Sequence, residues 1–152
     1  MKIAIIKYNA GNIKSVMLAL KRLGYEGVLT EDPEEILSAD RVIFPGQGEA
    51  SSAMKYLKDK GLDEVILNIK NPFLGICLGL QLLCKHSEEG DTNCLGIFDT
   101  EVKKFPNQLK VPHMGWNSVE HNNDACFSGI KSASYFYFVH SYFADICEQT
   151  IA

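Results

Sequence analysis

The sequence has no run of basic residues and no long apolar segment, and both absences limit what the chain can be. Its 152 residues carry fifteen Lys and Arg against nineteen Asp and Glu, a net charge of −4. Without a Lys/Arg-rich run, the chain lacks the charge pattern that would attract nucleic acid or an anionic membrane. The apolar run at residues 3–6 stops at Lys7. That run is too short for the core of a signal peptide or for a membrane span.

Metal-binding and nucleotide-binding spacings are absent as well. The five cysteines are an odd number without a signal peptide, and no C-x2-C pair occurs. This usage argues for a reduced cytoplasmic protein and against a disulfide scaffold or a structural zinc site. The glycine-rich loops match neither the G-x-G-x-x-G nor the Walker pattern. The sequence therefore suggests no nucleotide, flavin or metal cofactor.

The length and composition are those of one globular domain, with 46% hydrophobic and 22% charged residues. Apolar periodicity in the first half alternates between strand and helix. It predicts strands at residues 2–6, 26–30, 41–44 and 73–76, and helices at about 11–24, from 33, 50–59 and 62–70. Asp32, Pro33 and Glu35 form a helix start with a capping box, and Gly24 is placed to end the first helix. Such alternation predicts a parallel sheet covered on both faces.

The pattern changes after Gly90. Residues 95–105, 111–121 and 132–144 are expected to be strands without helices between them, joined by turns such as "PNQ" and "HNND". We expect them to finish or flank the sheet, partly antiparallel. No repeat, low-complexity segment or linker divides the chain. The expectation is one three-layer α/β/α domain with a mostly parallel sheet.

The stretch "FLGICLGLQLL" (73–83) places Cys77 between a short apolar strand and a helix. Gly75 and Gly79 permit backbone angles and close approaches that a Cβ forbids. A side chain at such an elbow projects above the sheet beside the free N–H groups of the new helix, which stabilise the reactive thiolate. This is the geometry of a nucleophile elbow with sulfur in place of a serine oxygen. The alternative is a small buried cysteine in a core helix.

Two further loops are expected at the carboxyl ends of strands, where ligands bind in open α/β sheets. In "FPGQGEA" (44–50), glycines flank Gln47 directly after a strand. Such a loop turns backbone N–H groups inward, as an oxyanion hole requires, although two glycines after a strand often mark only a tight turn. In "VHSYF" (139–143), His140 and Ser141 end an aromatic strand, and His140 could equally be a satisfied strand-end histidine.

Together these loops, in this order, resemble the class I, triad-type glutamine amidotransferases. The resemblance is closer to the glutaminase subunits of imidazole glycerol phosphate synthase and covers essentially all 152 residues. The stretches that carry it are "YNAGNIKSV" (8–16), "FPGQGEA" (44–50), "GICLGLQLL" (75–83), "VPHMGWN" (111–117) and "YFVHSYF" (137–143). The elbow motif is typical of the broad class, whereas "PHMGWN" and "GNIKSV" are typical of the histidine-biosynthesis members. The resemblance implies a flavodoxin-like fold of the class I glutamine amidotransferase type.

The resemblance also implies roles. Cys77 would attack the side-chain amide of glutamine, releasing ammonia and leaving a γ-glutamyl thioester that water cleaves. Backbone N–H groups of Leu78 and of the Gln47–Gly48 segment would hold the oxyanion. The residues expected to contact glutamine are Gln47, Gln81, His140, Ser141 and Tyr142. Ammonia would pass to a cyclase subunit with a TIM barrel, docked in a heterodimer on Asn12, His113, Met114, Trp116 and Asn117. For Trp116, the residues alone leave open a place in the core.

The sequence departs from the family in one respect. The family activates its cysteine with a histidine in a His-Pro-Glu segment, and no such segment occurs among His86, His113, His121 and His140. His86 begins the only His-x-Glu, but we expect it at the far end of the helix that starts at Cys77, about 13 Å away. In relatives the segment lies beyond the position of Ala152. The expectation is therefore a single amidotransferase domain, 1–152, that lacks its C-terminal portion and is impaired.

Two other functions stay open on the sequence. One is a catalytically inactive relative that only docks on the cyclase. The other is a different cysteine hydrolase, or a redox sensor, on a flavodoxin-like fold, although "PHMGWN" has no role in it. A reading frame that continues past Ala152 with a His-x-Glu would separate the enzyme from the docking protein.

Overall fold

Four short strands form a parallel sheet around the apolar segment at the N-terminus. In the computed structural model, which describes residues 1–9, 11–108, 110–122 and 124–152, β1 (Ile3–Ile6) lies between β2 (Gly27–Thr30) and β3 (Arg41–Phe44). Strand β4 (Phe73–Gly75) pairs with β3, and all pairs are parallel. All of β1 is buried, as a strand covered on both faces requires.

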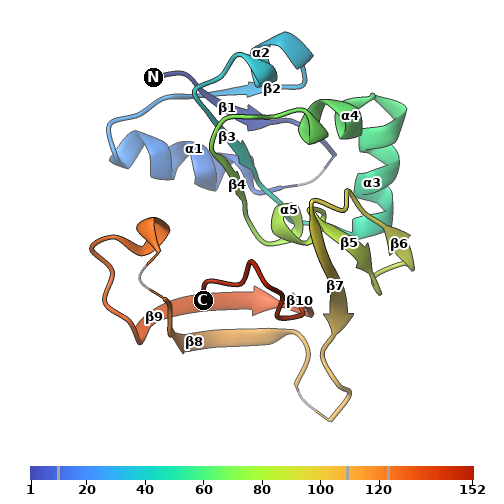
Figure 1. Cartoon of the computed structure of the whole chain (residues 1–152), viewed down its shortest axis with the longest axis vertical. Helices are drawn as coiled ribbons and strands as arrows, with labels where there is room; N and C mark the ends of the chain where they lie inside the picture. Colours follow the sequence, from blue (N-terminus) through green and yellow to red (C-terminus); the bar gives the residue numbers. More distant parts are fainter. Residues whose placement is uncertain (10, 109, 123) are drawn as a thin grey trace.

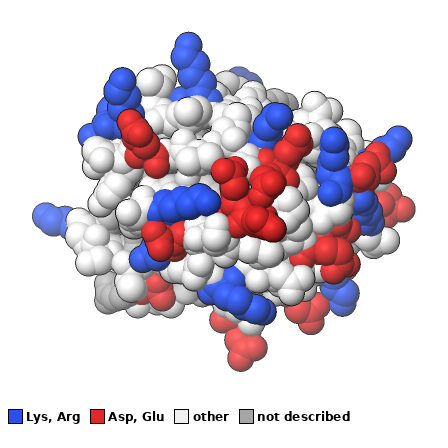
Figure 2. Space-filling model, turned by 90° about the horizontal axis from the view of Figure 1, so that it is seen from above, with Lys and Arg blue, Asp and Glu red and all other residues white. Residues whose placement is uncertain are grey.

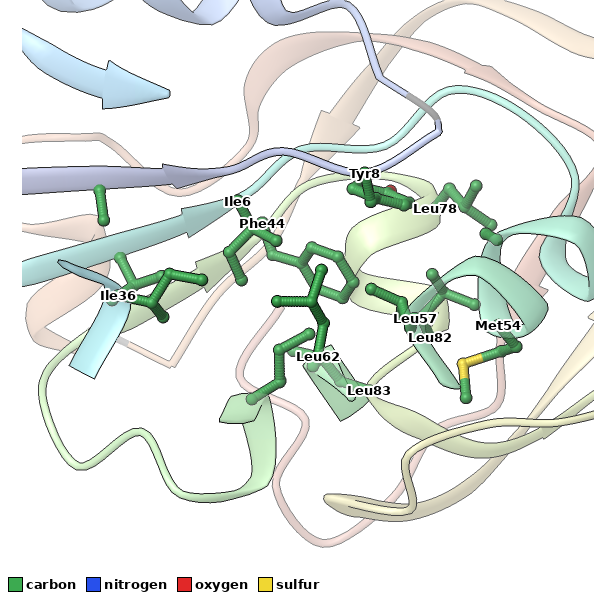
Figure 3. Close-up of a cluster of buried hydrophobic side chains, with 14 of the residues drawn as sticks. Ile6, Tyr8, Ile36, Phe44, Met54, Leu57, Leu62, Leu78, Leu82 and Leu83 are labelled. Carbon is green, nitrogen blue, oxygen red and sulfur yellow. The ribbon is translucent and has the colours of Figure 1, made fainter. Parts of the chain in front are cut away.

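Helices cover both faces of this sheet (Figure 1). On one face, α1 (Ile13–Arg22) packs Val16 and Leu20 against the side chains of Ile3, Ile5 and Ile43. On the other face lie α2 (Pro33–Leu37), α3 (Ala50–Asp59) and α4 (Leu62–Leu67), whose apolar side chains surround Phe44 (Figure 3). The predicted three-layer α/β/α arrangement is confirmed.

The predicted helix boundaries have identifiable causes. Gly24, with φ 80°, directly follows Leu23, the C-cap of α1, and ends the helix as predicted. At the start of α2, Asp32 Oδ1 accepts the Glu35 N–H at 2.9 Å. The Asp32 N–H donates to Thr30 Oγ1 at 3.0 Å and not to Glu35. The predicted capping box is therefore half formed, because a threonine at the end of β2 supplies the other acceptor.

The strands of the second half build sheets of their own, which corrects the expectation that they would finish or flank the parallel sheet. Among the described residues, β5 (Cys84–Ser87), β6 (Thr92–Asn93), β7 (Phe98–Lys104) and β10 (Tyr142–Ala144) form one sheet, in the order β10-β7-β5-β6. The long strands β8 (His113–Val119) and β9 (Ser134–His140) form an antiparallel ribbon. A short 3-10 helix, Ala125–Phe127, lies between them in the chain. Within the described residues, none of these strands pairs with β4. The turn predicted at 121–124 includes Asn123, outside the described residues.

The helix after Cys77 is shorter than the sequence indicated. Helix α5 spans only Leu78–Gln81, and β5 begins at Cys84. The carbonyls of Leu82, Leu83 and Cys84 accept hydrogen bonds from the N–H groups of Leu95, Phe98 and Gly96, at 2.8–2.9 Å. Because these carbonyls are engaged by a distant segment, the helix does not continue. The expectation that His86 ends this helix is wrong, since His86 lies on β5.

Charged side chains of both signs lie on the face of the molecule seen from above (Figure 2). On the face in Figure 2, Lys and Arg side chains are interspersed with Asp and Glu and do not gather in a patch. Within the described residues, no helix has the length and apolar character needed to cross a membrane.

Candidate active site

Cys77 occupies a strained turn between β4 and α5. Its backbone angles are φ 53° and ψ −115°, a conformation that residues with a Cβ rarely adopt. Close packing enforces the turn, because a Cβ on Gly79 would lie 1.9 Å from the Phe44 carbonyl oxygen. The Ile76 N–H donates to the same oxygen at 3.0 Å. Cys77 itself is exposed. The turn therefore presents a thiol above the sheet, as a nucleophile elbow does.

The loop that follows β3 lies directly against this elbow. A Cβ on Gly46 would lie 2.3 Å from the Gly79 backbone nitrogen. Gly48 has φ 149°, and the Gln47 carbonyl accepts the Gly11 N–H at 2.9 Å. Among the described residues, no hydrogen bond involves the N–H groups of Gly48 or Leu78. The Leu78 N–H directly follows Cys77, and the Gly48 N–H belongs to the loop that packs on the elbow through Gly46 and Gly79. Both are available to a ligand oxygen, as an oxyanion site requires.

Four of the predicted site residues line one cavity of about 720 Å³: Cys77, Gln81, His140 and Tyr142. Its remaining lining comes mainly from Phe98 and Thr100 on β7, the end of β9, and residues 143–152. A volume of this size suits a small-molecule ligand. Gln47, Gly48 and Ser141 do not line it. Ser141 uses its carbonyl to accept the Phe105 N–H at 3.1 Å.

Two side chains converge on the Tyr142 carbonyl. Gln81 Nε2 donates to it at 3.0 Å, and His140 Nδ1 lies 2.8 Å from it. A carbonyl oxygen can only accept, so His140 carries its proton on Nδ1 in this contact. The two contacts connect α5 with the link between β9 and β10. The sequence predicted that Gln81, His140 and Tyr142 belong to one site, but not that they contact one another.

The Tyr142 side chain is within electrostatic reach of three carboxylates that sequence reasoning did not single out as site residues. The pKa of Tyr142 is raised, first by burial and then by the negative charges of Glu89, Glu88 and Glu49. Glu89 also accepts the Ala50 N–H at 2.9 Å at the start of α3. In the sequence, only the stretch "SEEG" (87–90) after a buried segment marks Glu88 and Glu89. These three carboxylates do not line the cavity, but their negative charges act on Tyr142, which does.

The other three histidines do not line the cavity that contains Cys77. His86 Nε2 lies 2.9 Å from Asp91 Oδ1 on the β5–β6 turn. His121 stacks on Phe127 and contacts the Ile130 carbonyl at 3.1 Å. His113 packs its ring against Phe105, Phe138 and His140. Of the four histidines, only His140 lines the cavity that contains Cys77.

The residues predicted to meet a partner separate into three places. Asn12 is exposed and caps α1 by accepting the Ser15 N–H. Met114, Trp116 and Asn117 are exposed on β8, whereas His113 is half-buried. Residues 113–117 lie on β8, within the strand expected at 111–121, and they pair with β9 along their whole length. Asn12 lies before α1, outside this ribbon.

One face of the β8–β9 ribbon is nevertheless open and apolar. Trp116 is 66% exposed and meets the ring of Tyr137 edge-on, with centroids 5.5 Å apart. Met114 pairs with Val139 beside them. The exposed apolar side chains, called here the ribbon face, are Met114, Trp116, Tyr135, Tyr137 and Val139. Trp116 therefore does not belong to the core of the described chain.

No group of three His, Cys, Asp or Glu side chains that could hold a metal ion occurs in the part of the chain that the structure describes. What the site offers is a strained thiol, free backbone donors and a cavity lined by Gln81, His140 and Tyr142. This set suits nucleophilic attack on a carbonyl carbon.

Comparison with known proteins agrees with this chemistry. The profile of the family described as "Glutamine amidotransferase class-I" matches residues 5–151. The chain belongs to this family. Among solved structures, one titled as a glutamine amidotransferase superposes with a TM-score of 0.68 at 20% identity, covering 91% of this chain and 70% of that one. A glutamine amidotransferase from Thermotoga maritima superposes with a TM-score of 0.65 at 22% identity, covering 98% of this chain and 64% of that one.

Curated relatives point to one branch of the family. The chain is 55% identical over 155 residues to "Imidazole glycerol phosphate synthase subunit HisH" of Bacteroides thetaiotaomicron, covering 100% of this chain and 79% of that protein. It is 47% identical over 154 residues to the subunit of the same name from Dehalococcoides mccartyi, covering 98% of this chain and 75% of that protein. The resemblance read from the sequence is confirmed.

Proposed function

We propose that this chain acts as the glutaminase subunit of imidazole glycerol phosphate synthase, in the cytoplasm, releasing ammonia from glutamine for a cyclase subunit in histidine biosynthesis. The observation that carries the proposal is the strained conformation of Cys77. A non-glycine residue is held at φ 53° only where the surroundings over-determine it. Here those surroundings are the loop after β3 and the first turn of α5, which together supply free N–H donors.

The reaction follows from the parts of the site. Cys77 Sγ attacks the amide carbon of glutamine, and the N–H groups of Gly48 and Leu78 hold the oxygen as it becomes negative. The C–N bond breaks, ammonia leaves, and a γ-glutamyl thioester remains on Cys77. Water then attacks the thioester carbonyl, giving glutamate and the free thiol. The products balance as glutamine plus water giving glutamate plus ammonia.

The cavity supplies contacts for the rest of the substrate. The carboxylates of Glu49, Glu88 and Glu89 do not line the cavity, but they lie near enough to Tyr142 to raise its pKa. Their negative charge favours a ligand with a positively charged α-ammonium group beside Tyr142. Gln81 and the Tyr142 carbonyl, already hydrogen-bonded to each other at 3.0 Å, are placed to orient it. The amide end of glutamine would then point toward Cys77.

The general base is proposed to lie outside residues 1–152, in a His-x-Glu segment that completes the site. His86, His113 and His121 do not line the cavity that contains Cys77, and His140 Nδ1 is committed to the Tyr142 carbonyl. Strand β4 is an edge of the parallel sheet within the described residues, and its Leu74 is 55% exposed. A further strand beside β4 would cover this apolar edge and bring a base toward the thiol. The match to the Bacteroides relative extends over 79% of that protein, which leaves room for such a segment.

The ribbon face is the surface proposed to receive the cyclase, a TIM barrel, in a heterodimer. The relatives at 47–55% identity are named as subunits of a synthase. Free ammonia is readily protonated and lost to water, so its exit from the cavity must be sheltered. Tyr137 and Val139 belong both to the ribbon face and to the lining of the cavity. A partner docked there would therefore sit at the mouth of the glutaminase site.

The test is glutamine hydrolysis by two forms of the protein, each mixed with a bacterial cyclase subunit. One form is the 152-residue chain, and the other continues past Ala152 with the matching residues of the Bacteroides relative. We expect the extended form to be about 10²–10⁴-fold more active, the contribution of a general base. Full turnover by the 152-residue chain would mean that the base lies within it. An extended form that binds the cyclase but stays inactive would point to a docking protein.

A further inference from the structure

Tyr8 is a buried tyrosine at the carboxyl end of β1 for which the proposed mechanism has no role. It is 5% exposed, and its ring packs on Phe44 with centroids 5.0 Å apart. Figure 3 shows it beside Leu78, the first residue of α5. Its hydroxyl donates to the Pro45 carbonyl at 2.5 Å. A buried hydroxyl needs such a partner, but the partner here belongs to the loop that adjoins the nucleophile.

The loop after β3 is held between the elbow and the segment that carries Tyr8. On the elbow side, Gly46 and Gly79 are in backbone contact, and the Phe44 carbonyl accepts the Ile76 N–H. On the other side, the Tyr8 hydroxyl donates to the Pro45 carbonyl, and the Gly11 N–H donates to the Gln47 carbonyl. In a planar trans peptide the carbonyl and the next N–H point in opposite directions. Fixing these carbonyls on one side therefore directs the N–H groups of Gly46 and Gly48 to the other.

Tyr8 is also within electrostatic reach of the thiol. The pKa of Tyr8 is raised far above its usual value, chiefly by burial and further by the charge of Cys77. The hydroxyl consequently keeps its proton and remains a donor to Pro45 when Cys77 ionises.

We propose that Tyr8 is a positioning residue, whose hydroxyl seats the 45–48 loop against the Cys77 elbow and so directs its N–H groups toward the oxyanion. The inference rests on the proposed glutaminase function. It adds a residue from the first strand to a site otherwise built from the loops after β3, β4 and β9. Tyr8 acts on the reacting atoms only through the backbone of that loop.

The experiment compares Tyr8→Phe with Tyr56→Phe in the 152-residue chain. Tyr56, on α3, also donates its hydroxyl to one acceptor, Glu31 Oε2 at 2.7 Å, and it does not line the cavity that contains Cys77. Each protein is alkylated at Cys77 with two reagents, and the rates are followed by peptide mass spectrometry. A chloroketone analogue of glutamine develops a negative oxygen during attack and uses the oxyanion donors, whereas iodoacetamide needs only the thiolate.

Tyr8→Phe is expected to slow the chloroketone about 10-fold, less than the 10²–10³-fold loss of a direct oxyanion donor, and to leave iodoacetamide within about twofold. Tyr56→Phe should leave both rates unchanged. Equal rates in Tyr8→Phe and the unaltered chain, or an equal fall with both reagents, would overturn the role of Tyr8. If the unaltered chain shows no preference of the chloroketone for Cys77, the proposed function itself fails.

A measurement without substitution covers the case in which Tyr8→Phe does not fold. Tyrosine labelled with ¹³C at Cζ gives a separate NMR signal for each of the six tyrosines. Alkylation of Cys77 should shift the Tyr8 signal and leave the Tyr56 signal in place. A Tyr8 signal that does not respond would contradict the proposed coupling.

Discussion

The segments before and after Cys84 are packed in different ways. Among the described residues, the buried apolar side chains come almost entirely from residues 3–83, and only Cys84 and Val102 follow them. The ribbon of β8 and β9 has no buried residue at all. The first segment fixes the nucleophile through backbone contacts that leave no room for a Cβ, whereas the second presents open strands around the cavity. Catalytic geometry is thus set by the closed part of the molecule, and access and partner contact by the open part.

The largest expected effect distinguishes a cysteine of the elbow from one of the second segment. Cys77→Ala should lower glutamine hydrolysis by the extended form with the cyclase by about 10⁴-fold or more, since a nucleophile cannot be replaced by its neighbours. Cys126→Ala is the control, because Cys126 is exposed and does not line the cavity. Substantial activity in Cys77→Ala would remove the elbow from the reaction.

The packing difference itself can be tested with one added methyl group in each segment. Gly79→Ala should lower the free energy of unfolding by about 3 kcal/mol, because the new Cβ would lie 1.9 Å from the Phe44 carbonyl oxygen. A Cβ added at Gly115, on the ribbon, would have no atom within 4 Å. Gly115→Ala should therefore change the free energy of unfolding by less than about 0.5 kcal/mol. Urea titration of both variants checks this, and similar losses at the two positions would break the comparison.

Trp116→Ala should separate binding from folding in the open segment. A buried aromatic anchor at an interface contributes about 2 kcal/mol or more, so affinity for the cyclase should fall by that amount. The thermal melt should move by only a few degrees, because Trp116 loses chiefly its contact with Tyr137. Tyr25→Ala serves as the control, since Tyr25 is an exposed aromatic next to α1. A mutant that unfolds would place Trp116 in the core after all, and unchanged affinity would remove it from the interface.

The smallest effect lies where the two segments meet, at the start of α3. Hydrogen bonds from Ser51 and Ser52 lower the pKa of Glu49 to about 2, whereas burial raises the pKa of Glu89. Glu49 therefore stabilises the fold above its unfolded pKa of about 4.5. This contribution is lost as the pH falls from there through about 2.

The pH dependence of the stabilisation by Glu89 has the opposite sign. Protonated Glu89 stabilises the fold, and this stabilisation is lost as the pH rises through the pKa of Glu89 in the folded state. Because Glu49 is open to solvent, we expect an effect below about 1 kcal/mol. Unfolding free energies between pH 2 and 7 for Glu49→Gln and Glu89→Gln provide the measurement. Glu49→Gln should reduce the fall in the free energy of unfolding below about pH 4.5 and leave the values at higher pH unchanged. An unchanged fall would contradict the stabilising role of the hydrogen bonds from Ser51 and Ser52 to Glu49.

The first segment could be predicted closely from the sequence, and the second could not. Gly24 after α1 and Asp32 before α2 are local signals of helix ends. They could be recognised because these helix ends depend on residues that are adjacent in the sequence. Helix α5 was predicted too long because its end depends on hydrogen bonds from residues 95–98, which are distant in the sequence. The pairing of β8 with β9 is likewise non-local, and their apolar alternation does not say which strands they join.

The site shows the same division. The elbow at Cys77 was predictable because two glycines around one cysteine mark a strained turn. The environment of Tyr142, with Glu88 and Glu89, and the contact of Tyr8 with Pro45 were not, since each joins segments far apart in the chain. His113 was grouped with its neighbours on the motif, yet strand alternation turns its ring to the other side of the ribbon from Trp116.

The most direct test of the account is the order in which the five cysteines react with a chloroketone analogue of glutamine. Limited labelling of the folded 152-residue chain, with and without glutamine, is followed by peptide mass spectrometry. The elbow geometry predicts that Cys77 is modified first and that glutamine slows its modification. Modification of Cys84 or Cys126 ahead of Cys77, or labelling of Cys77 that glutamine does not slow, would contradict the claim that this turn presents a glutaminase nucleophile.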